Sequence, residues 1–228
     1  MVKKIYIGAD IDSGGAFIRS QVKDSARWWK NERNSMTVLR KRKIGNGASG
    51  MTKKILILSG SPRKQGNSDL LCDEFMRGAL EAGHTVEKIR VQEKKVAYCT
   101  ACYACRDTGN CAIKDDMAEI MEKMIACDVM VLASPVYFYS IDAQLKAVID
   151  RSVCRWTEVK NKEMYYIMTA ADGEKESMDT TLACFRGYAD CVEGAVEKGI
   201  IYGTGVYHAG EIKDTKCMQE AYMMGKNI

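Results

Sequence analysis

Histidine and proline are nearly absent from this chain of 228 residues, which holds two of each. With only His84 and His208, the chain has almost no material for a histidine metal site or a Ser-His-Asp catalytic triad. The scarcity of proline, together with a hydrophobic content of 46%, favours a compact globular domain over a disordered chain.

Long hydrophobic runs are also lacking. The most apolar stretch, residues 129–133, has the length of a strand and not that of a membrane span. Charged residues between positions 3 and 12 interrupt the N-terminal segment before an apolar signal core could form. We therefore expect no membrane partner. Ten cysteines in a chain without a secretory signal predict a cytoplasmic, reducing location.

An excess of positive charge is confined to the N-terminal fifth. Residues 1–50 carry 11 Lys and Arg against 4 Asp and Glu, whereas the rest of the chain carries 23 against 26. The main body lacks the basic patch that nucleic-acid binding requires, so we expect no nucleic-acid partner. Residues 1–50 are interpreted as an appendage of unknown role, either disordered or added by a misplaced start codon, with a basic nucleic-acid-binding arm as the alternative.

Beyond residue 51, hydrophobic strands alternate with helical patterns. This alternation predicts a parallel sheet covered by helices on both faces. In such sheets the ligand lies outside the carboxyl ends of the strands, and we expect the informative loops to follow strands one, three and four. The predicted strands cover residues 54–59, 85–91, 128–134, 164–168 and 197–203, and the predicted helices cover residues 67–82, 115–126, 141–152, 176–194 and 214–226.

The turn after the first predicted strand has the composition of an anion-binding loop. Ser59, Ser61 and Ser68 offer hydroxyl groups, and Arg63 offers a guanidinium group. Asn67 or Ser68 can cap the following helix, whose first amides would face a phosphate. The turn matches neither the Walker A motif nor the Gly-x-Gly-x-x-Gly dinucleotide loop, and it therefore suits a terminal monophosphate. An ordinary capped turn is the alternative.

Three aromatic residues follow the third predicted strand. Tyr137, Phe138 and Tyr139 could form a wall for a flat heteroaromatic ring, or could equally be core or interface residues. Pro135 fixes the backbone before them. The small, polar residues 169–173 after strand four would suit the close approach of a planar ligand, whereas residues 203–205 after strand five are interpreted as a plain turn.

Four cysteines fall within thirteen positions: Cys99, Cys102, Cys105 and Cys111. The spacing C-x2-C-x2-C-x5-C suits a cubic iron–sulfur cluster, because successive sulfurs can turn to one centre. Tetrahedral zinc usually takes two separated pairs, which fits this spacing less well. A loop of reduced cysteines without a metal is the alternative.

Together these motifs resemble those of the flavodoxin-like family of NAD(P)H-dependent FMN reductases, close to the iron–sulfur flavoproteins. The resemblance covers residues 53–228. It implies that residues 51–228 form an FMN-binding domain with a three-layer, doubly wound, five-stranded parallel sheet in the order 2-1-3-4-5. It rests on Gly60-Ser-Pro-Arg63 with Asn67-Ser68, on the four-cysteine motif running into Lys114-Asp115-Asp116-Met117, and on Ser134-Pro-Val-Tyr137 followed by Gln144-Leu145-Lys146 and Asp150-Arg151.

The resemblance also implies the residues of the cofactor sites. A flavin phosphate would lie at the first loop and an isoalloxazine ring along the third. The expected FMN-binding residues are Ser59, Ser61, Arg63, Asn67, Ser68, Pro135, Val136, Tyr137, Phe138, Ala170 and Ala171, and the candidate ligands of a 4Fe–4S cluster are Cys99, Cys102, Cys105 and Cys111.

The function implied is that of an FMN-dependent oxidoreductase. It would take a hydride from NAD(P)H and pass electrons to flavin, quinone or another small-molecule or protein acceptor. No side chain is expected to be catalytic, because the flavin carries the chemistry. The alternative is an iron–sulfur flavoprotein that carries electrons through a four-cysteine cluster next to FMN. A homodimer or homotetramer is expected in either case.

Overall fold

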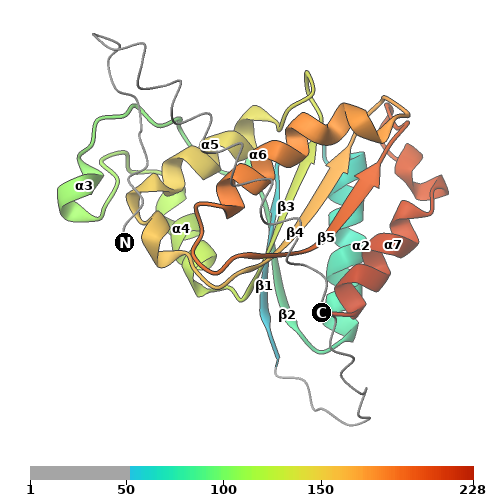
Figure 1. The fold of residues 1–228 in the computed structure, drawn as a ribbon, viewed down its shortest axis with the longest axis horizontal. Helices are drawn as coiled ribbons and strands as arrows, with labels where there is room; N and C mark the ends of the chain where they lie inside the picture. The colour runs from blue at the N-terminus through green and yellow to red at the C-terminus, as the bar shows by residue number, and fades with distance from the viewer. Residues whose placement is uncertain (1–51) are drawn as a thin grey trace, which may run out of the picture. The chain divides into compact units, whose positions relative to one another are not determined.

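The computed structural model describes residues 52–228, and the predictions for residues 1–50 lie outside this range. Five parallel strands form one sheet in the order β2-β1-β3-β4-β5, with helices on both faces (Figure 1). The three-layer, flavodoxin-like α/β fold expected from the sequence is thus confirmed. The strands are β1 (Lys54–Ser59), β2 (Thr85–Arg90), β3 (Val129–Pro135), β4 (Glu163–Thr169) and β5 (Val196–Gly203), and the longer helices are α2 (Asn67–Glu81), α4 (Met117–Ala126), α5 (Ala143–Arg151), α6 (Asp179–Ala189) and α7 (Cys217–Lys226).

The central strand β1 is apolar on both faces because both faces are covered. Leu56 and Leu58 pack on the side of α4, α5 and α6, whereas Ile55 and Ile57 pack on the side of α2 and α7. Successive side chains of a strand point to opposite faces, so a continuous apolar run is what a doubly covered strand requires.

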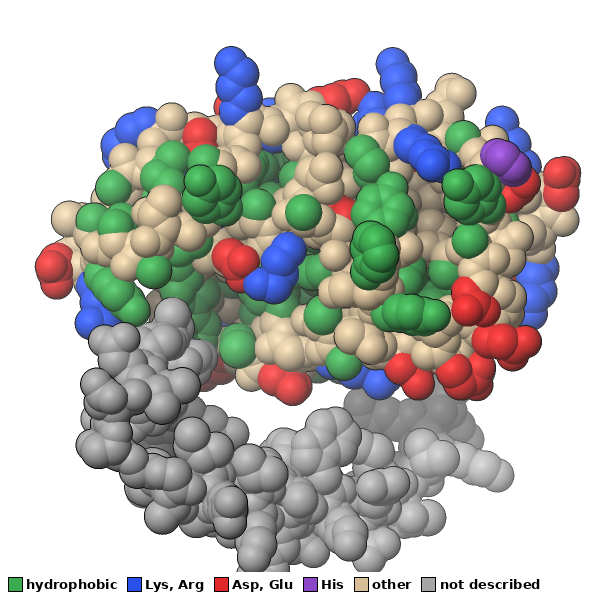
Figure 2. Space-filling view, turned by 90° about the horizontal axis from the view of Figure 1, so that it is seen from above, with side chains coloured by type: hydrophobic (Ala, Val, Ile, Leu, Met, Phe, Trp, Pro, Cys, Tyr) green, Lys and Arg blue, Asp and Glu red, His purple; other side chains and the backbone are tan. Residues whose placement is uncertain are grey.

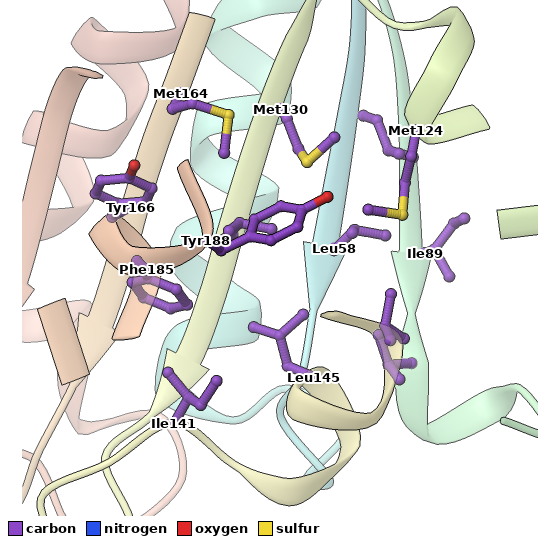
Figure 3. Packing of buried hydrophobic residues seen from close by; sticks show 14 of the residues in the cluster. Leu58, Ile89, Met124, Met130, Ile141, Leu145, Met164, Tyr166, Phe185 and Tyr188 are labelled. Atoms are coloured by element: carbon purple, nitrogen blue, oxygen red, sulfur yellow. The ribbon is translucent and has the colours of Figure 1, made fainter. Parts of the chain in front are cut away.

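The larger part of the core lies under α4, α5 and α6. Met124, Leu145 and Phe185 come from these three helices and pack in one cluster with Leu58 (Figure 3). The ring of Phe185 stacks on that of Tyr166 from β4, with the ring centroids 5.2 Å apart. This core holds the helices against the strands and fixes where the loops between them begin.

Two local predictions differ clearly from the structure, whereas the ends of other predicted elements shift by one to three residues. The side chains of Asn67 and Ser68 do not cap α2. The N-cap residue is Gly66, which has an extended backbone and no side chain that could accept a hydrogen bond. The predicted helix over 176–194 is shorter, because α6 ends at Ala189 and the chain then turns through Gly194, whose φ is +71°. None of the helices within residues 52–228 is long and apolar enough to cross a membrane.

Candidate functional site

The turns after β1, β3, β4 and β5 lie at one edge of the sheet, because the carboxyl ends of parallel strands point the same way. Figure 2 looks onto this edge, where hydrophobic side chains gather among Lys and Arg side chains. We name these turns the phosphate loop (residues 60–66), the aromatic loop (136–142), the β4 loop (170–174) and the β5 loop (204–212), and the segment before α4 the cysteine loop (98–112).

Gly60 opens the phosphate loop at a very close backbone approach. Its amide donates to the carbonyl of Ala133 at 2.8 Å, and a Cβ atom at this position would lie 2.1 Å from Oδ2 of Asp142. Asp142 is buried, accepts the hydroxyl of Ser134 at 2.7 Å and caps α5 by accepting the amide of Leu145 at 3.0 Å. Burial raises the pKa of this carboxyl group. Only glycine fits between the strand end and this cap.

The first turn of α2 offers three backbone donors. The amides of Asn67, Ser68 and Asp69 have no hydrogen-bond acceptor within the described residues, and the first helical bond runs from Leu70 to the carbonyl of Gly66 at 2.9 Å. Unpaired amides and the positive end of the helix dipole favour an anion at such a place. This arrangement suits the phosphate expected from the sequence.

A buried carboxylate shapes the loop before this helix. Asp69 accepts the amide of Gln65 at 3.1 Å, which holds Gln65 at a φ of +57°, and also accepts the hydroxyl of Ser59 at 3.3 Å. From β2, Lys88 Nζ lies 3.1 Å and Arg90 Nε 3.4 Å from the same carboxylate oxygen. These two cations offset the carboxylate charge, which would otherwise repel an anion at the helix start.

The β5 loop packs against the phosphate loop, which the sequence analysis missed. Arg63 donates to the carbonyl of Tyr207 at 2.9 Å. Asn67 donates to the carbonyl of His208 at 3.0 Å and accepts the amide of Gly210 at 3.0 Å. The side chain of Asn67, expected to hold phosphate, therefore fixes the β5 loop. The sequence could have indicated this contact, because the carboxyl end of a fifth parallel strand lies at the same edge of the sheet as those of the other strands.

The aromatic loop is a strained turn that exposes its rings. The backbones of Tyr137 and Ser140 pair through two hydrogen bonds of 3.0 Å. Phe138 and Tyr139 between them have φ of +49° and +62°, a costly conformation for bulky residues. All three aromatic residues are exposed, Phe138 completely. They are therefore not core residues, and they are available to a ligand or to another protein surface.

The remaining predicted residues lie beside these loops. Pro135 and Val136 are half-buried, and the amide of Val136 donates to the carbonyl of Thr169 at 2.8 Å. Ala170 is buried and its carbonyl accepts the amide of Val206 at 2.9 Å, whereas Ala171 is exposed. Backbone hydrogen bonds thus join the aromatic loop to the end of β4, and the β4 loop to the β5 loop.

The cysteine loop favours the thiolate at one of its positions, Cys102. The thiol sulfur of Cys99 accepts the amide of Ala101 at 3.5 Å. The pKa of Cys102 is lowered, chiefly by a hydrogen bond from the amide of Ala104 and then by one from the hydroxyl of Thr100. Thiolates are the form in which cysteines bind metals, so the donor chemistry fits a thiophilic metal or cluster.

The four cysteine sulfurs are not gathered around one point. Cys99 and Cys102 are exposed, whereas Cys105 and Cys111 are half-buried. Within residues 52–228, no three His, Cys, Asp or Glu side chains are arranged to hold a metal ion. Number, spacing and donor type fit a cluster, but binding would require the exposed part of the loop to rearrange.

A buried ion pair lies at the base of the cysteine loop. Arg151 contacts both carboxylate oxygens of Asp115, at 2.8 and 2.9 Å. Asp115 also accepts the amides of Ala97 at 2.9 Å and Met117 at 3.1 Å. Burial alone would raise the pKa of Asp115, but the hydrogen bonds from Arg151 and the two amides lower it below the ordinary value.

Backbone strain is concentrated in these loops. Strained conformations persist only where the surrounding structure holds them, and they are frequent at functional sites. Of the six described non-glycine residues with positive φ, all but Asn161 lie in the phosphate, cysteine and aromatic loops: Gln65, Ala101, Tyr103, Phe138 and Tyr139.

The fold and this edge define a flavodoxin-like oxidoreductase. The chain matches the family model described as NADPH-dependent FMN reductase over residues 53–189. It is also 33% identical over 181 residues to an iron–sulfur flavoprotein of Archaeoglobus fulgidus, covering 77% of this chain and 78% of that one. The chain therefore belongs to the NADPH-dependent FMN reductase family and is an oxidoreductase enzyme.

Other relatives match more locally or in fold alone. An iron–sulfur flavoprotein of Methanosarcina thermophila is 46% identical over 100 residues, which cover 44% of this chain and 52% of that protein. An NAD(P)H:quinone oxidoreductase from Methanothermobacter marburgensis superposes with a TM-score of 0.63 at 17% identity, covering 77% of this chain and 96% of the other. An azoreductase from Bacillus anthracis also superposes with a TM-score of 0.63, at 14% identity, covering 78% of this chain and 100% of the other.

The close approach at Gly60 can be tested by adding one methyl group. In Gly60→Ala the new Cβ would overlap the carboxylate of Asp142. We expect the free energy of unfolding, measured in urea, to be about 1–3 kcal/mol lower than that of the wild type. Gly187→Ala on α6 is the matched control, because nothing lies within 4 Å of its Cβ position. A Gly60→Ala protein as stable as the wild type would contradict the close packing of Gly60 against Asp142.

The ion pair at the cysteine loop predicts a pH dependence. Asp115→Asn leaves the buried Arg151 without a counter-charge, and we expect a loss of about 3 kcal/mol of unfolding free energy near pH 7. Because the folded-state pKa of Asp115 lies below its unfolded value, its contribution is complete above about pH 4 and is lost as pH falls through the folded-state pKa. Urea unfolding of both proteins at decreasing pH should show the difference shrinking, and a constant difference would exclude this account.

Proposed function

We propose that the chain binds FMN at the carboxyl edge of the sheet and transfers electrons from NAD(P)H to a small-molecule or protein acceptor. The observation that carries the proposal is the set of three amides at the start of α2 that have no acceptor within residues 52–228, next to a strained loop with three exposed aromatic rings. One end of this site suits a phosphate and the neighbouring part suits a flat ring.

The phosphate end depends on the phosphate loop and α2. The amides of Asn67, Ser68 and Asp69 would donate to phosphate oxygens, and the exposed Arg63 supplies a charge-assisted donor beside them. Asp69 itself would not repel the phosphate, because Lys88 and Arg90 lie against its carboxylate. The chain's contribution here is to bind and orient.

The ring end depends on the aromatic loop and the β4 loop. When bound, FMN supplies hydride and electron transfer. Tyr137, Phe138 and Tyr139 provide apolar surface for a ring and restrict the access of water. Pro135 and Val136 present backbone groups at the ring's edge, and Ala170 and Ala171 leave room for a planar ligand.

Reduction by a nicotinamide nucleotide is the direct test of the reaction. We expect the protein, loaded with FMN under anaerobic conditions, to lose the visible absorbance of oxidised flavin on addition of NADPH or NADH, and to regain it with a quinone. Free FMN without protein is the control. A bound flavin that stays oxidised with both nucleotides would contradict NAD(P)H as the electron donor.

The phosphate end can be tested separately by FMN affinity. Arg63→Ala removes charge-assisted hydrogen bonds worth about 1.5–3 kcal/mol, and because Arg63 is exposed we expect the lower value, about a tenfold rise in the Kd of FMN. Lys64→Ala is the matched control, since Lys64 is an exposed neighbouring cation with no guanidinium fork. Titration of the apoprotein by flavin fluorescence measures both, and an unchanged Kd in Arg63→Ala would count against the site.

A second candidate function is that of an electron carrier with an iron–sulfur cluster at Cys99, Cys102, Cys105 and Cys111. The observation that favours it is the N–H···S hydrogen bond to Cys99, together with the lowered pKa of Cys102, in a loop whose base is held by the ion pair of Arg151 and Asp115. An absorbance spectrum and iron analysis of anaerobically purified protein distinguish the candidates, because the carrier requires stoichiometric iron in addition to flavin.

A further inference from the structure

Among residues 52–228, Arg151 is the largest side chain that is buried almost completely, with 1% of its surface exposed. It is the last residue of α5 and lies far from the phosphate loop along the sequence. A buried guanidinium is expensive unless its donors are used, so its partners indicate its role.

The guanidinium of Arg151 joins the two ends of the cysteine loop. Nη1 donates to the carbonyl of Ala97 at 2.8 Å, and Nη2 donates to the carbonyl of Ile113 at 3.3 Å. These residues immediately precede and follow the loop of residues 98–112. Each Nη also donates to one carboxylate oxygen of Asp115. One planar guanidinium group therefore holds the two ends of the loop together.

One donor of this group is left over. Nε of Arg151 is buried and has no hydrogen-bond partner among the described residues, an uncommon situation for a charged group. The thiol of Cys111, one of the four motif cysteines, interacts electrostatically with the same guanidinium. The spare donor thus belongs to a group that lies within electrostatic range of a sulfur of the cysteine loop.

The helix that carries Arg151 also begins at the candidate flavin site. Asp142 caps α5 and lies against Gly60, whereas Arg151 ends the helix at the cysteine loop. Nine residues of α-helix span about 14 Å. In Figure 1, α3 (Cys105–Thr108) is drawn on the side of the sheet that carries α4 and α5. The hydrogen bonds of Arg151 therefore join the cysteine loop to α5, a helix that starts at the end of the aromatic loop.

We propose that Arg151 is a positioning residue for a cluster in the cysteine loop, closing the base of the loop with its Nη groups and leaving Nε–H as a donor to the thiolate ligands. The inference rests on the second candidate function above. Hydrogen bonds to ligand sulfurs are among the factors that set the reduction potential of iron–sulfur clusters, and groups that orient metal ligands affect metal affinity 10–100-fold.

The test uses the full chain, purified anaerobically and reconstituted with iron and sulfide. We expect Arg151→Leu to retain about a tenth or less of the wild-type iron, with its FMN content unchanged. Arg151→Lys keeps the charge beside Asp115 but lacks the fork, and we expect it to retain cluster with a reduction potential more negative than that of the wild type. Iron and FMN analysis and a potentiometric titration followed by electron paramagnetic resonance measure these quantities.

Arg155→Leu is the matched control, because Arg155 follows the same helix but pairs with Glu122 and Glu158 instead of the loop. It should keep wild-type iron and potential. Wild-type iron in Arg151→Leu, or a wild-type potential in Arg151→Lys, would overturn the role of Arg151. If Arg151→Leu loses FMN as well, it is misfolded and Arg151→Lys decides. A wild-type chain that takes up no iron would overturn the cluster and this inference together, leaving the FMN function standing.

Discussion

Parallel pairing of β1 with β3 is the constraint on which the rest of the structure depends. The two strands are in register from Ile55 opposite Val129 to Ser59 opposite Ala133, and the amide of Gly60 adds one more bond beyond the strand end. From β1 the chain crosses to β2 on one side, whereas β3 leads to β4 on the other. The loops after β1 and β3 therefore separate at this point, where ligands of doubly wound sheets bind.

Buried or half-buried carboxylates support each of the unusual loops. Asp69 holds the left-handed residue of the phosphate loop, Asp142 ends the aromatic loop and caps α5, and Asp115 fixes the base of the cysteine loop. Each accepts at least one backbone amide, and Asp69 and Asp115 also face cations. Carboxylates of this kind allow strained loops to persist, because they supply acceptors where the regular backbone pattern stops. An FMN-dependent oxidoreductase thus obtains a prearranged edge from groups that do not themselves need to react.

Much of the fold could be predicted from the sequence because it depends on local pattern. The continuous apolar runs at 55–58 and 129–133 could only be strands covered on both faces, and β1 begins and ends at the predicted residues. The end of α6 was predicted less well, because apolar residues continue through Val192 after the helix has stopped. The composition of the phosphate loop indicated an anion site, but the assignment of a helix cap to Asn67 was wrong, since its side chain bonds to the β5 loop instead.

The sequence by itself determined the order of strands and helices, the family resemblance and which loops carry hydroxyl, aromatic and thiol groups. Only the tertiary structure decided how these loops support one another. Arg63 meets Tyr207 across 144 residues, and Arg151 meets Asp115 across 36. No periodicity encodes such pairs, because they form only after the sheet has brought separate strand ends to one edge and packed the helices against it.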